Sequence, residues 1–508
     1  METDVIVVGA GPVGLMLAGE LRLGGVGVTV FERRAVPSGA SRGLGFTALA
    51  MEIFNQRGLY ARLAGAEPAR QGHFGGIPLD FGVLDGAFFT VRGVFQYQVE
   101  RILEDWATGL GASILRDHEV TGLAEQSDGI LAEISGPGGR STAKAAFLVG
   151  CDGGRSTVRQ QAGFEFTGAE ATREMYLADV VGCHIKPRFI GERVPGGMAM
   201  SAPLEGGVDR IIVCEDGTPP SGSRQSVTFD QVADAWQRLT GESLHGAESR
   251  WVSAFTDAAR QATQYRRGRV LLAGDAAHIH LPAGGQGLSL GVADAANLGW
   301  KLAATIRGTA PAALLDTYHS ERHPVGERVL RNSLAQGMLY LTGEEMQPLR
   351  SVLSEVVAIP DAARHLSGMI SGLDIRYDPG QSPAHPLAGR RLPDSELLLS
   401  GGGRERVSAR LHPARGVLIR AADAAGSGSA IAGWQDRVDV VTVSGFPAVA
   451  AAGGEATEAV LVRPDGYVAW AGPGYGPLEE ALGRWFGPPR ARDDGQPASG
   501  AERITTTA

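Results

Sequence analysis

The sequence has little cysteine and no long uninterrupted apolar run. Its three cysteines, Cys151, Cys183 and Cys214, are odd in number and form no C-x-x-C pair. This pattern excludes a disulfide framework and a cysteine zinc site, and it indicates a reducing compartment. Residues 5–19 are mostly apolar, but glycines interrupt them and acidic residues precede them, unlike a signal peptide. No other stretch reaches the about 18 apolar residues of a spanning helix. We therefore expect a cytoplasmic protein without a membrane partner.

Charge is not concentrated in either sign. The 47 basic and 56 acidic residues give a net charge of −9 and form no long blocks, which argues against a nucleic-acid partner. A composition of 43% hydrophobic and 20% charged residues excludes disorder of the whole chain. The length of 508 residues corresponds to about two to four domains.

The order of strand and helix patterns predicts an α/β fold. Residues 4–8 and 27–32 have the pattern of buried strands, and residues 15–23 between them have helical spacing. Such a β-α-β unit opens a Rossmann-like sheet. Further strands are expected at 145–151, 269–273, 417–420, 438–443 and 459–463, and further helices at 51–63, 99–107, 290–307, 314–342 and 478–485. Residues 71–95 and 175–254 are expected to be rich in strands.

A glycine-rich loop, Gly9-Ala10-Gly11-Pro12-Val13-Gly14, follows the first predicted strand. Gly9 permits a tight turn, Gly11 lets the backbone approach a pyrophosphate, and Gly14 permits close packing of helix on strand. The helix N-terminus adds free N–H groups and positive potential. We expect Gly9, Gly11, Pro12, Val13 and Gly14 to contact a dinucleotide.

Glu32 ends the second predicted strand, about twenty residues after the loop. A carboxylate there can accept hydrogen bonds from ribose hydroxyls and repels a 2′-phosphate, so the loop suits FAD or NAD and disfavours NADP. The alternative is a surface salt bridge between Glu32 and Arg33 or Arg34. The loop and Glu32 do not distinguish FAD from NAD.

Two later motifs make that distinction. One is the string Asp152-Gly153-Gly154-Arg155-Ser156-Thr157-Val158-Arg159, and the other runs from Gly268 through Gly274-Asp275 to His278. The second continues as Pro282-Ala283-Gly284-Gly285-Gln286-Gly287-Leu288, and a helix pattern with Tyr318, Glu321, Arg322 and Pro324 follows. Together with the N-terminal glycines, these motifs closely resemble the single-component (group A) flavoprotein aromatic hydroxylases over residues 4–330.

Three further strings narrow the resemblance. The segments 72–82 and 371–377 are similar to those of hydroxylases from bacterial aromatic polyketide pathways, angucyclines in particular. Residues 385–394 are similar to the entry into the thioredoxin-like C-terminal domain of these enzymes. Because no cysteine lies beyond Cys214, that domain cannot exchange dithiols.

The resemblance implies a division into domains. The FAD-binding domain comprises 1–72, 96–175 and 255–385, and a sheet-rich substrate domain, 73–95 and 176–254, is inserted in it. Residues 386–488 form the thioredoxin-like domain without redox cysteines, and residues 489–508 form a disordered tail. Whether the protein is a monomer or a homodimer is left open.

The resemblance also implies cofactor contacts beyond the glycine loop. Asp275 can accept hydrogen bonds from ribityl hydroxyls, although a helix N-cap is its alternative role. Asp152 and Gly153 touch FAD and influence use of the nicotinamide, unless Asp152 only pairs with Arg159 in a turn. The remaining expected cofactor contacts are Glu32, Arg33, Arg42, Gln96, Pro282, Gly285, Gly287, Leu288 and Ser289. For Arg42 and Gln96, a plain surface or salt-bridge role is the alternative. The family usually has Asn where Ser289 stands. His278 and His280 alternate along a short stretch but lack a third ligand, so no metal is expected.

The implied activity is FAD-dependent monooxygenation with NADPH or NADH and O2. In the family, O2 adds to reduced flavin, and the resulting C4a-hydroperoxide transfers OH to an electron-rich carbon of the substrate, here a polycyclic aromatic polyketide in antibiotic biosynthesis. No catalytic side chain is assigned. Phe74, Phe81 and Phe89 are candidate substrate contacts, with ordinary core packing as the alternative. Baeyer–Villiger oxidation, hydroxylation coupled to dehydration, antibiotic inactivation, a flavin-binding accessory role and a nicotinamide-only dehydrogenase remain open.

Overall fold

The computed structural model describes residues 1–39, 41, 43, 45–63, 68–84, 91–92, 94–220, 227–311, 313–380, 385–422, 431–445, 457–472 and 476–490. Arg42 and Phe89, two residues of the expected site, lie outside these ranges.

The first sheet carries the Rossmann-like part of the chain. Its strand order is β18-β19-β10-β1-β2-β7, and β8 and β9 extend it from β10. Strands β19, β10, β1, β2 and β7 run parallel. The strands are β1 (Glu2–Val8), β2 (Val28–Glu32), β7 (Ser113–Arg116), β8 (Glu119–Gln126), β9 (Gly129–Gly136), β10 (Gly139–Gly150), β18 (Arg266–Arg267) and β19 (Val270–Leu272).

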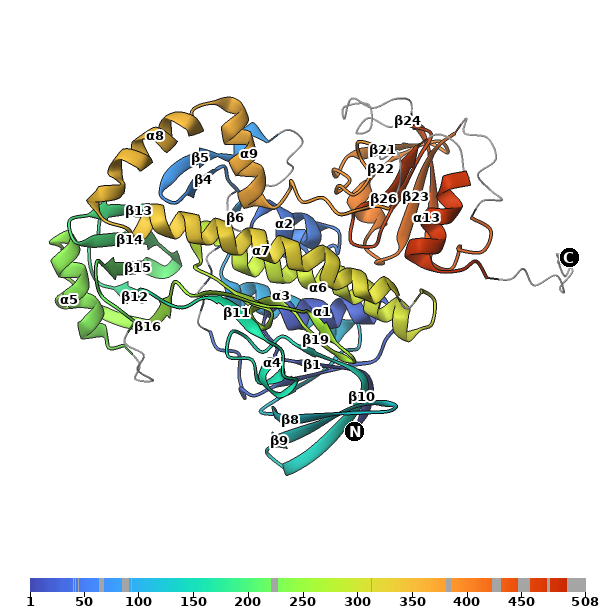
Figure 1. The fold of residues 1–508 in the computed structure, drawn as a ribbon, viewed down its shortest axis with the longest axis horizontal. Coiled ribbons are helices and arrows are strands. Elements are labelled where there is room, and N and C mark those ends of the chain that lie inside the picture. The colour runs from blue at the N-terminus through green and yellow to red at the C-terminus, as the bar shows by residue number, and fades with distance from the viewer. Residues whose placement is uncertain are drawn as a thin grey trace, which may run out of the picture.

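Helices cover this sheet and extend beyond it (Figure 1). Helices α1 (Pro12–Leu23) and α4 (Thr157–Gln161) contact the sheet, α3 (Gln96–Gly109) and α6 (Gln286–Ile306) pack on α1, and α2 (Ala48–Asn55) packs on α6. The long α7 (Ala313–Leu341) runs beside α6, and α8 (Gln347–Val357) and α9 (Pro360–Ser371) return from its end. The single helix expected over 51–63 is instead α2 followed by the short 3-10 turn Tyr60–Leu63, because Gly58 between them has a φ of 70°.

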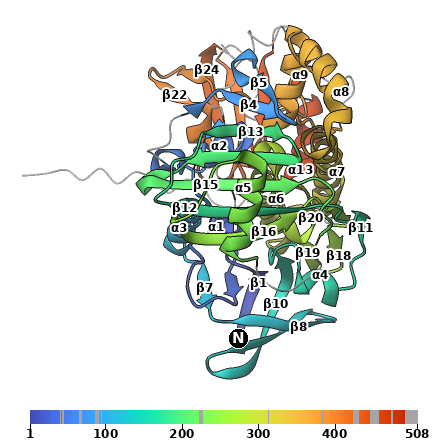
Figure 2. The ribbon, with the colours of Figure 1, turned by 90° about the vertical axis from the view of Figure 1, so that its left-hand side faces the viewer.

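A second, antiparallel sheet forms the far end of the molecule. Its order is β13-β14-β15-β12-β16, and Figure 2 shows α5 lying across it. The elements are β12 (Glu174–Val181), β13 (Arg188–Val194), β14 (Gly197–Pro203), β15 (Val208–Glu215), α5 (Phe229–Thr240) and β16 (Glu248–Thr256). The strand-rich pattern of this region did not predict α5, which Thr228 and Gln231 begin with a capping box.

Smaller sheets lie outside these two. One has the order β11-β17-β20, formed by β11 (Phe166–Ala169), β17 (Ala259–Ala262) and β20 (His278–Ile279). Two strand pairs join β3 (Pro68–Ala69) with β6 (Val91–Arg92), and β4 (Gln71–Phe74) with β5 (Ile77–Asp80).

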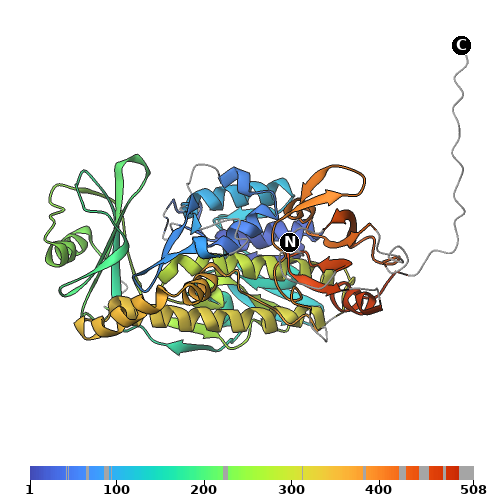
Figure 3. The same cartoon turned by 90° about the horizontal axis from the view of Figure 1, so that it is seen from above.

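The C-terminal sheet has the order β22-β21-β24-β23-β25-β26. Strands β23 and β24 are parallel, whereas β25 and β26 are antiparallel to each other. The elements are β21 (Glu396–Leu399), β22 (Arg404–Arg406), α10 (Val407–Arg410), β23 (Gly416–Ala421), β24 (Val438–Gly445), β25 (Ala459–Val462), β26 (Val468–Gly472) and α13 (Gly476–Phe486). Seen from above, this domain and the β12–β16 sheet lie at opposite ends of the α6–α7 pair (Figure 3). The expected α/β fold class is confirmed. Among the described helices, none is long and apolar enough to span a bilayer.

Candidate functional site

The three motifs meet because they follow neighbouring parallel strands. Val8 of β1 lies opposite Phe31 of β2 and Gly150 of β10, and Gly150 lies opposite Leu272 of β19. The carboxyl ends of these strands are therefore in register. In open α/β sheets, ligands bind in the crevice outside such ends. The glycine loop, Glu32, the Asp152-Gly153 turn and the Gly274-Asp275 turn all border this crevice.

The glycine loop combines crowded and open positions. A Cβ on Gly9 would lie 2.5 Å from the Cys151 carbonyl oxygen, and a Cβ on Gly14 would lie 2.0 Å from the Gly9 carbonyl oxygen. Gly11, in contrast, has no atom within 4 Å of its Cβ position. Helix α1 begins directly after Gly11 with no side-chain cap and no acidic residue in its first turn. The N–H groups of the first turn of α1 are thus free for an anion such as a diphosphate.

Glu32 is held against the glycine loop by backbone hydrogen bonds. Its Oε2 accepts from the Ala10 N–H at 2.9 Å, and its Oε1 accepts from the Arg34 N–H at 3.0 Å. A carboxylate offers about four lone-pair sites, so capacity remains for a ribose. Within the described chain, Glu32 forms no ion pair with Arg33 or Arg34, and Arg33 is exposed.

Arg159 ties the second motif to the third. Its guanidinium donates to the Ala276 carbonyl at 2.9 Å and to the Gly154 carbonyl at 2.7 Å. Within the described chain, Arg159 therefore does not form the ion pair with Asp152 that was considered as the alternative. Asp152 Oδ2 accepts from the Val158 N–H, whereas its buried Oδ1 has no partner within the described chain. Burial raises the pKa of Asp152.

The Gly274-Asp275 turn is supported from below by Asp294 of α6. Asp294 Oδ2 accepts from the Gly274 N–H at 3.1 Å and from His278 Nε2 at 2.7 Å. Its Oδ1 accepts from Arg322 at 2.8 Å. Although burial acts to raise it, Arg322 and His278 hold the pKa of Asp294 below its usual value. Asp275 itself is exposed at the crevice, accepts no hydrogen bond within the described chain and does not cap the short helix that begins there.

The 282–289 segment forms the other wall of the crevice. Pro282 and Gly285 are exposed and Gly287 and Leu288 are half-buried. Helix α6 starts at Gln286 with Gly285 in the left-handed conformation and no side-chain cap, which leaves its N–H groups free. The buried Ser289 hydroxyl accepts from the Thr47 N–H at 2.8 Å, so Ser289 in place of Asn performs a structural task.

Gln96 is positioned at the start of α3. Its N–H donates to the Ser41 hydroxyl at 2.7 Å, and its Nε2 donates to Glu100 at 2.8 Å. The Ser41 hydroxyl in turn donates to the Gly43 carbonyl, and a Cβ on Gly43 would touch the Leu288 side chain. Ser41 and Gly43 thus connect Gln96 to Leu288, and a contact of Gln96 with the flavin edge stays a prediction.

This donor set fits FAD. Cβ positions at Gly11, Gly153 and Gly285 would meet nothing within 4 Å, which is the space that a closely approaching ligand needs. The same motifs carry two helix N-termini without side-chain caps, the Asp152 Oδ1 and the exposed Asp275 carboxylate, neither of which has a partner within the described chain. Free N–H groups suit phosphate and flavin carbonyl oxygens, and the carboxylates suit hydroxyls.

The two described candidates for substrate contact, Phe81 and Phe74, differ in how far they are buried. Phe81 is 2% exposed and packs with Leu79 and Ile370, while Phe74 lies half-buried at the edge of the same cluster. Phe81 is thus placed as a core residue. Asp294, Arg322 and Thr47 are not among the predicted site residues. Arg322 belongs to the Tyr318–Pro324 motif, whereas no motif in the sequence marks Thr47. No group of three His, Cys, Asp or Glu side chains suited to a metal occurs in the described ranges.

Comparison with known proteins places these features in a family. Residues 2–333 match the family described as FAD binding domain, and residues 385–489 match aromatic-ring hydroxylase, C-terminal. Relatives are similar over almost their full length. A 12-dehydrotetracycline 5-monooxygenase/anhydrotetracycline 6-monooxygenase of Streptomyces rimosus is 42% identical, with 96% of this chain and 100% of the relative aligned. A rifampicin monooxygenase of Streptomyces venezuelae is 41% identical over 95% of this chain and 98% of its own.

A solved structure is more similar still. CabE, described as an aromatic hydroxylase from angucycline biosynthesis, is 56% identical to this chain, with 96% of this chain and 100% of CabE covered and a TM-score of 0.92. The likeness therefore extends over nearly the whole chain.

Proposed function

This chain belongs to the FAD-dependent aromatic-ring hydroxylases, and from that membership we propose that it hydroxylates a polycyclic aromatic polyketide in antibiotic biosynthesis. The single observation that carries the substrate class is the 56% identity to an angucycline hydroxylase over nearly the whole chain. The reaction consumes substrate, O2, NADPH or NADH and one proton, and it yields hydroxylated product, water and the oxidised nicotinamide.

Each part of the chain has a proposed task. Residues 1–72, 96–175 and 255–385 bind FAD, residues 73–95 and 176–254 enclose the substrate, and 386–488 form the thioredoxin-like domain. The free cysteines support a reducing, cytoplasmic setting, and the protein acts as a monomer or a homodimer.

The cofactor contacts follow from the crevice. Bound FAD supplies the activation of O2 and the transfer of oxygen. Gly9 to Gly14 and the α1 N-terminus bind the diphosphate, Glu32 accepts from the adenosine ribose, and Asp275 accepts from the ribityl chain. The N-terminus of α6, from Gly285 to Ser289, stabilises negative charge on the pyrimidine side of the flavin. Exclusion of water by the surrounding walls favours oxygen transfer over release of H2O2.

The test combines cofactor release with product analysis. Heat-denatured protein is expected to release FAD in a ratio near one per chain. With NADPH or NADH, tetracyclic phenols should accelerate nicotinamide oxidation, and ¹⁸O2 should place one labelled atom in the product. If no aromatic polyketide stimulates oxidation while FAD is bound, the substrate class is wrong. A product carbon skeleton with a new ester, seen by NMR, would indicate Baeyer–Villiger oxidation.

Antibiotic inactivation is the second candidate function. The 41% identity to a rifampicin monooxygenase over 95% of this chain supports it. The two functions differ in substrate: an inactivating enzyme oxidises the finished antibiotic, whereas a biosynthetic enzyme oxidises its unsubstituted precursor. Competition between rifampicin and a tetracyclic phenol for the same holoenzyme, read as relative kcat/KM, separates them.

A further inference from the structure

The C-terminal domain docks on the FAD-binding part through buried charges. The turn between β25 and β26, residues 463–467, is buried throughout. Arg463 donates to both carboxylate oxygens of Glu321 on α7 and also pairs with Asp465. Asn297 on α6 donates to Asp465 at 3.2 Å. This turn therefore rests directly on α6, whose start borders the crevice, and on α7.

Tyr377 connects this docked turn to α7. Its ring packs against the Tyr467 ring with 4.2 Å between centroids. Its N–H donates to the Gly389 carbonyl at 2.8 Å. The C-terminal domain thus holds both the backbone and the ring of Tyr377. Its hydroxyl then accepts from Arg322 of α7 at 2.8 Å.

Arg322 carries the contact onward to the FAD-binding crevice. It is 0% exposed and donates to Asp294, which is also 0% exposed and accepts the Gly274 N–H. Four consecutive contacts therefore join Tyr467 to the turn that presents Asp275. Every member is buried, and a buried hydrogen bond to a charged group contributes more than an exposed one.

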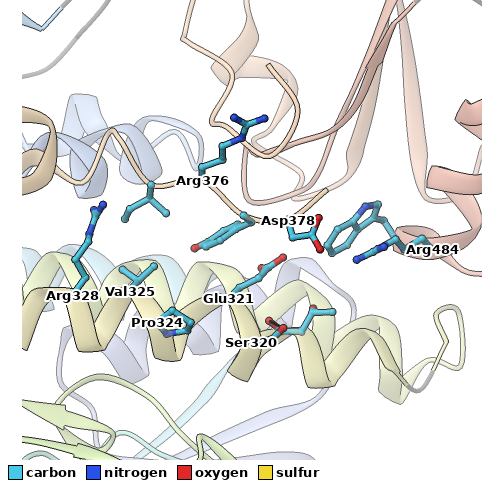
Figure 4. A pocket seen from close by; sticks show the side chains of 12 residues that line it. Ser320, Glu321, Pro324, Val325, Arg328, Arg376, Asp378 and Arg484 are labelled. Atoms are coloured by element: carbon cyan, nitrogen blue, oxygen red, sulfur yellow. Dashed lines mark hydrogen bonds between the residues drawn. The ribbon is translucent and has the colours of Figure 1, made fainter. Parts of the chain in front are cut away.

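Apolar packing across this junction, where Trp300 of α6 and Leu314 of α7 share a buried cluster with the C-terminal domain, is interrupted beside Tyr377. A cavity of about 410 Å³ opens beside Tyr377, between α7, the 375–378 segment and α13. Figure 4 shows that Arg328, Arg376 and Arg484 around it do not converge on one point, so the cavity itself is not a built anion site. Besides its place in the apolar core, Tyr377 is oriented by its contacts with Tyr467, Gly389 and Arg322.

We propose that Tyr377 is a positioning residue for FAD, which acts through Arg322 and Asp294 on the Gly274-Asp275 turn. Docking of the C-terminal domain thereby tightens the cofactor site. This inference rests on the proposed contact between Asp275 and FAD. It gives a domain without redox cysteines a task in the hydroxylase reaction.

The test is the Tyr377→Phe variant, which keeps the ring contact and removes the acceptor of Arg322. Apoprotein is titrated with FAD at a temperature at which far-UV circular dichroism shows a folded chain. We expect the FAD Kd to rise about fivefold, since part of a charged hydrogen bond is lost. The matched control is Tyr340→Phe. It removes a different buried tyrosine hydroxyl, which lies on α7 and donates to the Ile190 carbonyl, and it should change the FAD Kd less than about twofold.

Coupling between binding sites is reciprocal, which supplies a second readout. FAD should slow amide hydrogen exchange at residues 463–467 in the wild-type protein and should slow it less in Tyr377→Phe. An unchanged Kd in Tyr377→Phe, or exchange protection equal to that of wild type, overturns the inference.

The Asp275→Ala variant distinguishes a failure of the proposed contact between Asp275 and FAD from a failure of the proposed role of Tyr377. If Asp275→Ala loses FAD and Tyr377→Phe does not, the result supports the FAD contact of Asp275 and shows that the proposed role of Tyr377 is wrong. If Asp275→Ala binds FAD like wild type, the proposed ribityl contact and the inference both fall.

Discussion

At the scale of single residues, the space around each glycine separates folding roles from binding roles. Gly14 has no room for a Cβ, whereas Gly11 adopts an ordinary extended conformation, with φ −79° and ψ 179°, beside open space. A side chain at Gly14 would meet protein, and one at Gly11 would meet the ligand.

We therefore predict that Gly11→Ala leaves the unfolding temperature of the apoprotein nearly unchanged and raises the FAD Kd at least about tenfold, because its methyl group occupies diphosphate space. Gly14→Ala should instead lower the unfolding temperature. Gly109→Ala, also in open space but on α3, is the control for both measurements. Normal FAD affinity in Gly11→Ala would exclude the diphosphate from this loop.

We predict that the stability of the protein depends on pH through His73, which lies in the β4–β5 hairpin. Burial lowers the pKa of His73 to about 4, and its ring packs on Tyr340. Above pH 6.5 the imidazole is neutral in both the folded and the unfolded state. As pH falls from 6.5 toward 4, the unfolded chain takes up the proton first, so His73 destabilises the fold progressively.

His73→Asn removes this titration. The difference in unfolding free energy between wild type and variant, from urea unfolding, should shift in favour of the variant between pH 6.5 and pH 4. A difference that stays constant over this range would show that His73 does not titrate as described.

At the scale of elements, the crevice is built by segments that anchor one another. The start of α6 carries Ser289, whose hydroxyl accepts the Thr47 N–H just before α2. This bond anchors the start of α2 on α6, and Ser41 separately accepts the Gln96 N–H at the start of α3.

Ser289→Ala leaves the buried Thr47 N–H without an acceptor. We expect a loss of about 1–3 kcal/mol in unfolding free energy and faster release of FAD, measured by urea unfolding and by flavin fluorescence. Ser289→Asn, the residue usual in the family, can supply an amide oxygen and should recover most of both. If Asn fails where Ser succeeds, the anchor depends on the shorter side chain.

At the scale of the whole molecule, charged side chains join the domains. Glu321 accepts from Arg463 and Lys301 in the buried contact. Burial acts to raise its pKa, but these two cations outweigh burial and lower the pKa of Glu321 to about 2. The stability from this pairing is present above pH 4.5 and is lost as pH falls from about 4.5 to about 2.

Glu321→Gln leaves Arg463 and Lys301 without their carboxylate. Breaking one side of a buried pair costs about 3–5 kcal/mol, so we expect a marked fall in the unfolding temperature at pH 7 and a flatter acid dependence below pH 4.5, by calorimetry. Asp361→Asn, in the exposed pair with Arg364, should cost less than about 1 kcal/mol. If the Glu321→Gln protein is as stable as Asp361→Asn, the ion cluster around Glu321 does not stabilise the docking contact.

The sequence by itself determined the α/β class, the cofactor and the position of the crevice. Turn glycines, a strand-end carboxylate and a helix start lie within a few residues of one another, so local pattern suffices to predict them. It could not separate core from pocket at Phe81, because both environments select aromatic residues. The tertiary structure alone decided how the walls and the C-terminal domain are held. Ser289 lies 242 positions from Thr47, and Arg463 lies 142 positions from Glu321, and no periodicity along the chain marks partners that only folding brings together.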